Sequence, residues 1–86
     1  MRAEKFSELI RKQPFEPLRM HMTDGRMIDI THPDQVMVLR QRIDVGIPTA
    51  PGFDILEWVE HCSLLHLVRV EPLRRAAGEN AVSQAN

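Results

Sequence analysis

Residues 18–30 read LRMHMTDGRMIDI and predict a tight β-hairpin. A two-residue loop at Asp24-Gly25 would place Asp29 on the same face as the apolar residues of the first strand. A three-residue loop with a glycine bulge shifts the register by one residue, so that Leu18 faces Ile30. Because a one-residue slip exchanges the two faces of a strand, only the second register collects the apolar side chains on one side. We therefore predict the three-residue loop.

The same register assigns the remaining hairpin residues. Gly25 takes a positive φ, where a Cβ atom is costly, so Asp24 and Gly25 are interpreted as a structural turn. The apolar face comprises Leu18, Met20, Ile28 and Ile30. The opposite face comprises Arg19, His21, Met27 and Asp29.

Composition describes an ordinary globular chain of 86 residues, with 43% hydrophobic and 27% charged residues. The formal net charge of −1 supplies no overall basic field for nucleic acid. Cys62 is the only cysteine, which excludes an internal disulfide and is typical of a reducing compartment. No secretory signal, transit peptide or membrane-spanning run is recognised, so we expect a cytoplasmic protein without a membrane partner.

The rest of the chain predicts one helix and further short strands. The helix covers residues 3–12, and a turn follows at residues 32–34. Apolar strands are expected at residues 36–39, which form a run suited to burial on both faces, at residues 43–47 and at residues 64–70. Residues 48–52 form a loop and residues 61–63 a tight turn. Residues 53–60 fit a strand better than a helix, although both patterns are present.

A barrel explains this order of elements better than a flat sheet. One ten-residue helix cannot cover the second face of a flat sheet, whereas closure removes both bare faces and free edges.

We expect a single domain over residues 1–72 and a flexible tail over residues 73–86. The predicted core is Phe6, Leu9, Ile10, Leu18, Met20, Ile28, Ile30, Val36, Val38, Val45, Ile55, Val59, Leu65 and Leu67.

A helix, then a strand–Asp24-Gly25–strand hairpin, then three more strands resembles the Sm-like (SH3-like) small β-barrel over residues 4–71. The resemblance implies a mainly β fold of about five short, strongly bent antiparallel strands after one N-terminal helix. It also implies RNA binding as a possible function. The family's Asp-Asn and Arg-Gly motifs are replaced here by residues 32–34 and by Cys62-Ser63.

A second resemblance is to a group of small bacterial proteins to which no activity is assigned. It is carried by three stretches: Pro14-Phe15 with Pro17, Asp24-Gly25-Arg26 with His32-Pro33, and Leu64-Leu65-His66 with Glu71-Pro72. It implies the same fold and no mechanism.

Two groups of residues have the side chains of catalytic or metal sites but not the arrangement. His61, Cys62 and His66 lack the spacing of a zinc site, and Cys62 lacks an evident oriented base. Glu57 and Glu60 lie three residues apart and would point to opposite faces of a strand. We therefore assign no catalytic, metal or cofactor residue and no small-molecule substrate, and we expect a protein that is not an enzyme.

Two sets of residues remain as candidate contact sites. Met27, Met37 and Trp58 are candidates for contact with another protein or a second copy, since methionine adapts to irregular interfaces. Arg19, Arg26, Arg40 and Arg42 could bind an acidic partner or RNA. We expect a non-catalytic small barrel that acts by protein–protein contact and self-associates. An RNA-binding module is the alternative, and a metal protein or enzyme is third.

Overall fold

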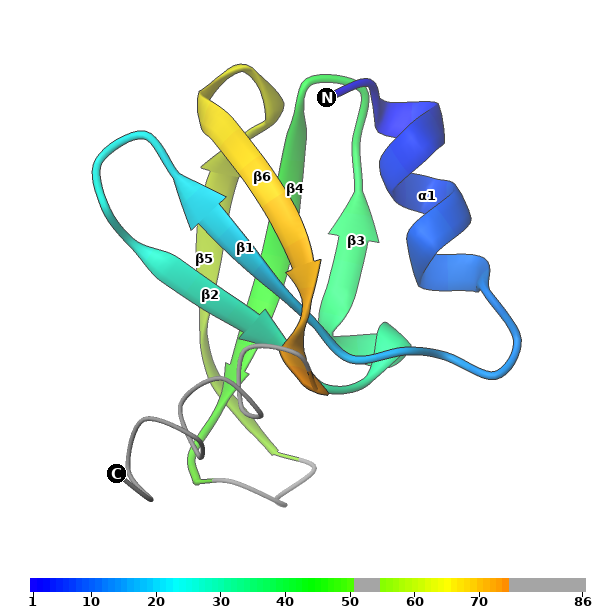
Figure 1. The fold of residues 1–86 in the computed structure, drawn as a ribbon. Helices are drawn as coiled ribbons and strands as arrows, with labels where there is room; N and C mark the ends of the chain where they lie inside the picture. Colours follow the sequence, from blue (N-terminus) through cyan, green and yellow to red (C-terminus); the bar gives the residue numbers. More distant parts are fainter. Residues whose placement is uncertain (51–54, 75–86) are drawn as a thin grey trace, which may run out of the picture.

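The computed structural model describes residues 1–50 and 55–74, which form one helix and two three-stranded antiparallel sheets (Figure 1). The sheets have the strand orders β2-β1-β6 and β3-β4-β5 and lie one in front of the other. The elements are α1 (Ala3–Arg11), β1 (Leu18–Met22), β2 (Met27–Ile30), the 3-10 helix η1 (Pro33–Gln35), β3 (Val36–Val38), β4 (Arg42–Pro48), β5 (Leu56–Ser63), the 3-10 helix η2 (Leu64–His66) and β6 (Leu67–Pro72).

The β1–β2 hairpin has the predicted register. Leu18 pairs with Ile30 and Met20 with Ile28, and all four side chains are buried. Gly25 has φ +90° and donates its backbone N–H to the carbonyl oxygen of Met22 at 3.0 Å. The glycine bulge therefore places the apolar face of the hairpin toward the core, as the position of Asp29 required.

The fold is mainly β with one N-terminal helix, as expected. Between the described residues no ladder of strand pairs joins the two sheets, so the expected closed barrel is not observed. The two sheets instead bury their facing side chains against each other, with Met20 and Ile30 from one and Ile43 and Val45 from the other fully buried.

Helix α1 lies beside β3 and closes one side of the core (Figure 1). Phe6 is fully buried, and Leu9 and Ile10 pack partly against the core. Glu4 in the first turn and Arg11 in the last turn suit the helix dipole. The predicted amphipathic helix is thus confirmed to within one residue.

The side chain of Gln35 in helix η1 links the segment that follows β2 to strand β4. The Gln35 Oε1 atom accepts hydrogen bonds from the backbone N–H groups of Thr31 and His32, both at 2.9 Å. The Gln35 Nε2 atom donates to the carbonyl oxygen of Gly46 in β4 at 3.0 Å. The turn expected after Thr31 is present, but the sequence did not indicate this link.

The boundaries of the last two strands differ from the prediction. Residues 56–63 form a strand, as favoured over a helix, but the expected turn at residues 61–63 is wrong. The ladder with β4 continues through Cys62 and Ser63, because β4 extends far enough to pair with both. The turn is η2, and the last strand covers Leu67–Pro72 rather than residues 64–70.

Three residues of the predicted core are exposed in the structure. Ile55, Val59 and Leu65 are 70%, 50% and 85% exposed. Cys62 pairs with buried Ile43, so Trp58, Glu60 and Cys62 are on the side of β5 that faces the core, and Val59 faces outward. In η2 the i and i+3 positions share a side, so Leu64 and Leu67 are buried and Leu65 is not.

The run at residues 36–39 is also not covered on both faces. Val36 and Val38 pack partly against the core, whereas Met37 between them is exposed on the other side of β3. Met22, Ile43, Cys62 and Leu64 are buried without having been placed in the predicted core.

The loop predicted at residues 48–52 begins later, because Pro48 is the last residue of β4 and pairs with Leu56, and residues 51 and 52 lie outside the described residues. The predicted tail lies outside the described residues from residue 75 onward. No helix within residues 1–50 and 55–74 is long and apolar enough to cross a membrane.

Candidate protein-contact surface

Strand β5 is the longest strand and lies at the edge of its sheet. It pairs with β4 on one side, and in the described parts of the chain no strand pairs with its other side. Leu56, Trp58 and Val59 expose 43–50% of their surface, and Ile55 just before the strand exposes more. An edge strand with exposed apolar side chains is a template for pairing with another chain.

The outer face of sheet β3-β4-β5 carries a row of paired side chains. Met37, Asp44 and His61 stand opposite one another in β3, β4 and β5. His61 Nδ1 lies 2.7 Å from Asp44 Oδ1, and Arg42 Nε donates to the same oxygen at 3.1 Å. The hydrogen bond from His61 and then the one from Arg42 hold the pKa of Asp44 below its ordinary value.

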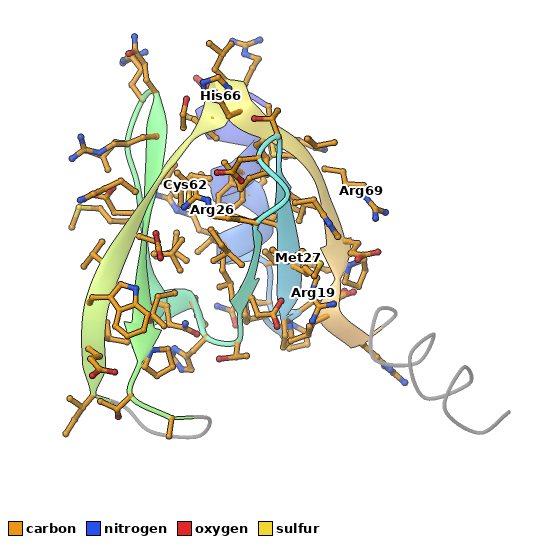
Figure 2. All side chains as sticks on the ribbon, turned by 90° about the vertical axis from the view of Figure 1, so that its left-hand side faces the viewer. Arg19, Arg26, Met27, Cys62, His66 and Arg69 are labelled. Carbon is orange, nitrogen blue, oxygen red and sulfur yellow. The ribbon has the colours of Figure 1, made fainter. Side chains whose placement is uncertain are left out.

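The side chains of β5 that face the other sheet are linked by hydrogen bonds to the turn of the β1–β2 hairpin. Trp58 Nε1 donates to Glu60 Oε1 at 3.3 Å, and Arg26 Nη1 donates to Glu60 Oε2 at 3.2 Å. Arg26 Nε also donates to Asp24 Oδ2 at 2.8 Å. Figure 2 shows Arg26 and Cys62 between the two sheets. Arg26 therefore joins the tip of the β1–β2 hairpin to the edge strand.

The outer face of sheet β2-β1-β6 is an ion-pair network. Arg19 Nε donates to Asp29 Oδ1 at 2.7 Å, and His21 Nε2 lies 2.7 Å from Glu71 Oε1. The bond to His21 and the charge of Arg69 hold the pKa of Glu71 below its ordinary value. This face connects β1 to both of its neighbours by polar side-chain contacts.

The three residues predicted for protein contact are exposed but lie on different surfaces. Met27 is on the outer face of sheet β2-β1-β6, on the far side of the hairpin from Cys62 in Figure 2. Met37 is on the outer face of sheet β3-β4-β5, and Trp58 is on its inward row. The structure thus does not bring these residues into one patch.

The four arginines predicted for anion contact are likewise separated. Arg19 bonds Asp29 in the first sheet, and Arg26 bonds Asp24 and Glu60 at the hairpin tip. Arg40 lies in the turn between β3 and β4, and Arg42 bonds Asp44 in β4. Three of the four guanidinium groups are therefore already engaged by carboxylates of the same chain.

The histidines and cysteine considered for metal binding do not converge. His61 and Cys62 are neighbours in β5 and point to opposite faces, while His66 lies in η2. No group of three or more potential ligands was found in residues 1–50 and 55–74. Burial raises the pKa of the Cys62 thiol, and this opposes formation of a nucleophilic thiolate.

Sequence reasoning placed Val59 in the core and did not single out Leu56 as a contact residue. The available signal was that residues 55–59 contain four apolar residues, so no single face of a strand could hold them all.

No protein-family model, curated protein or solved structure matches this chain. The resemblances to Sm-like barrels and to small bacterial proteins with the Asp-Gly-Arg and His-Pro stretches therefore stay predictions.

Proposed function

We propose that this protein is a non-catalytic module that acts by protein–protein contact and associates with itself. The observation that carries the proposal is the free edge of β5, flanked by exposed Leu56, Trp58 and Val59. Tryptophan and arginine, here Trp58 and Arg26, which both bond Glu60, are residue types that recur at the centres of protein interfaces.

The chain length supports the same proposal. A domain of this size buries only about 60–65% of the surface of its unfolded chain, so a second copy adds apolar burial that the monomer lacks. Exposed apolar side chains occur in several elements of the described residues, and four of them, Ile55, Leu56, Trp58 and Val59, follow one another closely in or just before β5.

Light scattering after size-exclusion chromatography tests the proposal. We expect a mass above that of the 9.9 kDa chain, and we expect Val59→Lys to lower it. Met27→Lys is the matched control, because Met27 is similarly exposed but belongs to the other sheet. A wild-type protein that is strictly monomeric at tens of micromolar contradicts self-association.

We also propose that the two sheets are the halves of an open Sm-like barrel in a cytoplasmic protein. The order of elements supports this fold: β1 pairs with both β2 and β6, and η1 carries the chain from one sheet to the other. RNA binding has less support, because Arg19, Arg26 and Arg42 bond carboxylates within the chain. The buried Cys62 is compatible with a reducing compartment.

A further inference from the structure

We propose that two copies of the chain join β5 to β5 in antiparallel register, with Val59 of each copy facing Val59 of the other. The two sheets β3-β4-β5 would then form one six-stranded sheet. This inference rests on the proposed self-association and specifies the surface, the symmetry and the register.

The backbone of β5 presents its free hydrogen-bonding groups at the right residues. Leu64 donates its N–H to the carbonyl oxygen of Gln41, and Leu39 donates to that of Arg42. In an antiparallel ladder the residues alternate in the direction of these groups. Cys62, Glu60 and Trp58 therefore bond to β4, while Val59 and His61 point their N–H and C=O groups to the free edge.

Symmetry leaves few registers. Residues directly opposite each other in an antiparallel pair share a face of the sheet, so a two-fold axis must pass through a residue of β5 rather than between two residues. The central candidates are Trp58, Val59 and Glu60.

Charge selects Val59 among these three. A centre at Glu60 places two carboxylates opposite each other, which is unfavourable. A centre at Trp58 places Glu57 opposite the partner's Val59. A centre at Val59 places Glu57 opposite the partner's His61 twice, and Trp58 opposite the partner's Glu60 twice. The second contact repeats between copies the indole–carboxylate hydrogen bond that already exists within one chain.

The His61 side chain is oriented for the contact with the partner's Glu57. Its Nδ1 atom is bonded to Asp44, which leaves Nε2 for the partner's Glu57. Asp44, itself bonded by Arg42, and Met37 in β3 share this face with His61. The side chain is therefore oriented by its own sheet before the partner arrives.

The structure also limits the length of the shared ladder. At one end, the register with β4 shifts between Ile47 and Pro48, where Glu57 is the extra residue of β5 between Leu56 and Trp58. At the other end, the hairpin turn approaches η2, since Thr23 donates its N–H to the carbonyl oxygen of His66 at 2.9 Å. Residues 58–61 lie between these two irregularities, and the Val59 register uses them together with the side chain of Glu57.

Disulfide trapping tests the register. Three single-cysteine additions are oxidised separately: Val59→Cys, Trp58→Cys and Glu60→Cys. Mass spectrometry of peptides identifies the cross-linked position, and the oxidised wild type shows how much cross-linking Cys62 alone produces. Opposite hydrogen-bonded residues lie about 5.5 Å apart between Cα atoms, within the range of a disulfide. We expect Val59→Cys to form a 59–59 dimer about tenfold faster than either neighbour forms its own.

The outcomes separate this inference from the proposed function. Faster cross-linking of Trp58→Cys or Glu60→Cys overturns the register. A wild-type dimer in which none of the three cross-links overturns the β5 interface and leaves self-association standing. A monomeric wild type overturns both.

A charge reversal gives an independent measurement should a cysteine variant fail to fold. Glu57→Lys places a cation opposite the partner's His61 at two sites, so we expect the dimer dissociation constant to rise about tenfold. Glu8→Lys in α1 is the matched control, because this exposed residue carries the same charge change far from β5. An unchanged dissociation constant for Glu57→Lys contradicts the proposed register.

Discussion

Asp44 and His61 are joined across β4 and β5, with 2.7 Å between Oδ1 of the aspartate and Nδ1 of the histidine. Arg42, two residues earlier in β4, donates to the same oxygen. This carboxylate is accordingly held ionised by two neighbours on the outer face of the sheet, next to the free edge of β5.

This pairing predicts acid sensitivity. The folded-state pKa of Asp44 lies below the unfolded value of about 3.9, so the unfolded chain binds more protons in acid. The contribution of Asp44 to stability is therefore present above about pH 4 and is lost as the pH falls through the folded-state pKa. Asp44→Asn should flatten the fall in unfolding free energy below pH 4, measured by urea denaturation at a series of pH values.

Glu8→Gln is the control for that measurement, because the Glu8 side chain is exposed on α1. Glu8→Gln should leave the fall in unfolding free energy below pH 4 unchanged. If this fall is as steep in Asp44→Asn as in the wild type, the result contradicts the role of the pairing. The pKa values of Glu71 and Asp24 are also lowered, mainly by the hydrogen bond to His21 and by the backbone N–H of Arg26, so both carboxylates contribute to the slope with the same sign.

Gly25→Ala should destabilise the fold through backbone conformation alone. A Cβ atom at Gly25 would meet nothing within 4 Å, but φ is +90°. We expect a loss of about 1–2 kcal/mol in the free energy of unfolding. Gly25→Asn should lose less, since asparagine tolerates positive φ better. Equal stability of the alanine variant and the wild type would show that the turn changes its conformation at little cost.

Gly46→Ala should destabilise the fold through a steric contact. A Cβ atom there would collide with Cδ1 of Leu56 and lie 3.1 Å from its Cγ, so the leucine side chain must move. We expect a cost of about 1 kcal/mol. In a Leu56→Ala background the same substitution should cost less, and a double-mutant cycle should give a coupling of at least about 0.5 kcal/mol. Additive effects would argue against the contact.

Two substitutions distinguish the observed core from the one predicted by the sequence. Ile43 is fully buried, so Ile43→Ala should cost about 2–5 kcal/mol. Leu65 is 85% exposed, so Leu65→Ala should change stability by no more than about 0.5 kcal/mol. Thermal or urea unfolding at one protein concentration measures both. A large loss at Leu65 would place that side chain in an interface.

The hairpin shows how much local sequence can determine. Its register follows from Asp29, Gly25 and the apolar positions on either side of the turn, all within thirteen residues. The prediction succeeded because hairpin pairing depends on neighbours in sequence and on a single buried face. The helix at Ala3–Arg11 was predictable for a similar reason, since its apolar spacing is also local.

Strand β5 shows where local sequence was insufficient. Apolar residues occur on both of its faces, so periodicity alone did not decide which face is buried. The face was set by pairing with β4, which places Cys62 opposite Ile43 and turns Val59 outward. The same pairing separates His61 from Cys62 and leaves one edge of β5 free within the described residues.

By itself, the sequence determined the class of fold, the helix, the hairpin and its register, because each depends on contacts between residues close in the chain. The tertiary structure decided the buried face of β5, the separation of the exposed methionines and arginines, and the bonds of Gln35 and Arg26 between the sheets. These features depend on pairs that are distant in sequence, and only the packing of the two sheets brings them together.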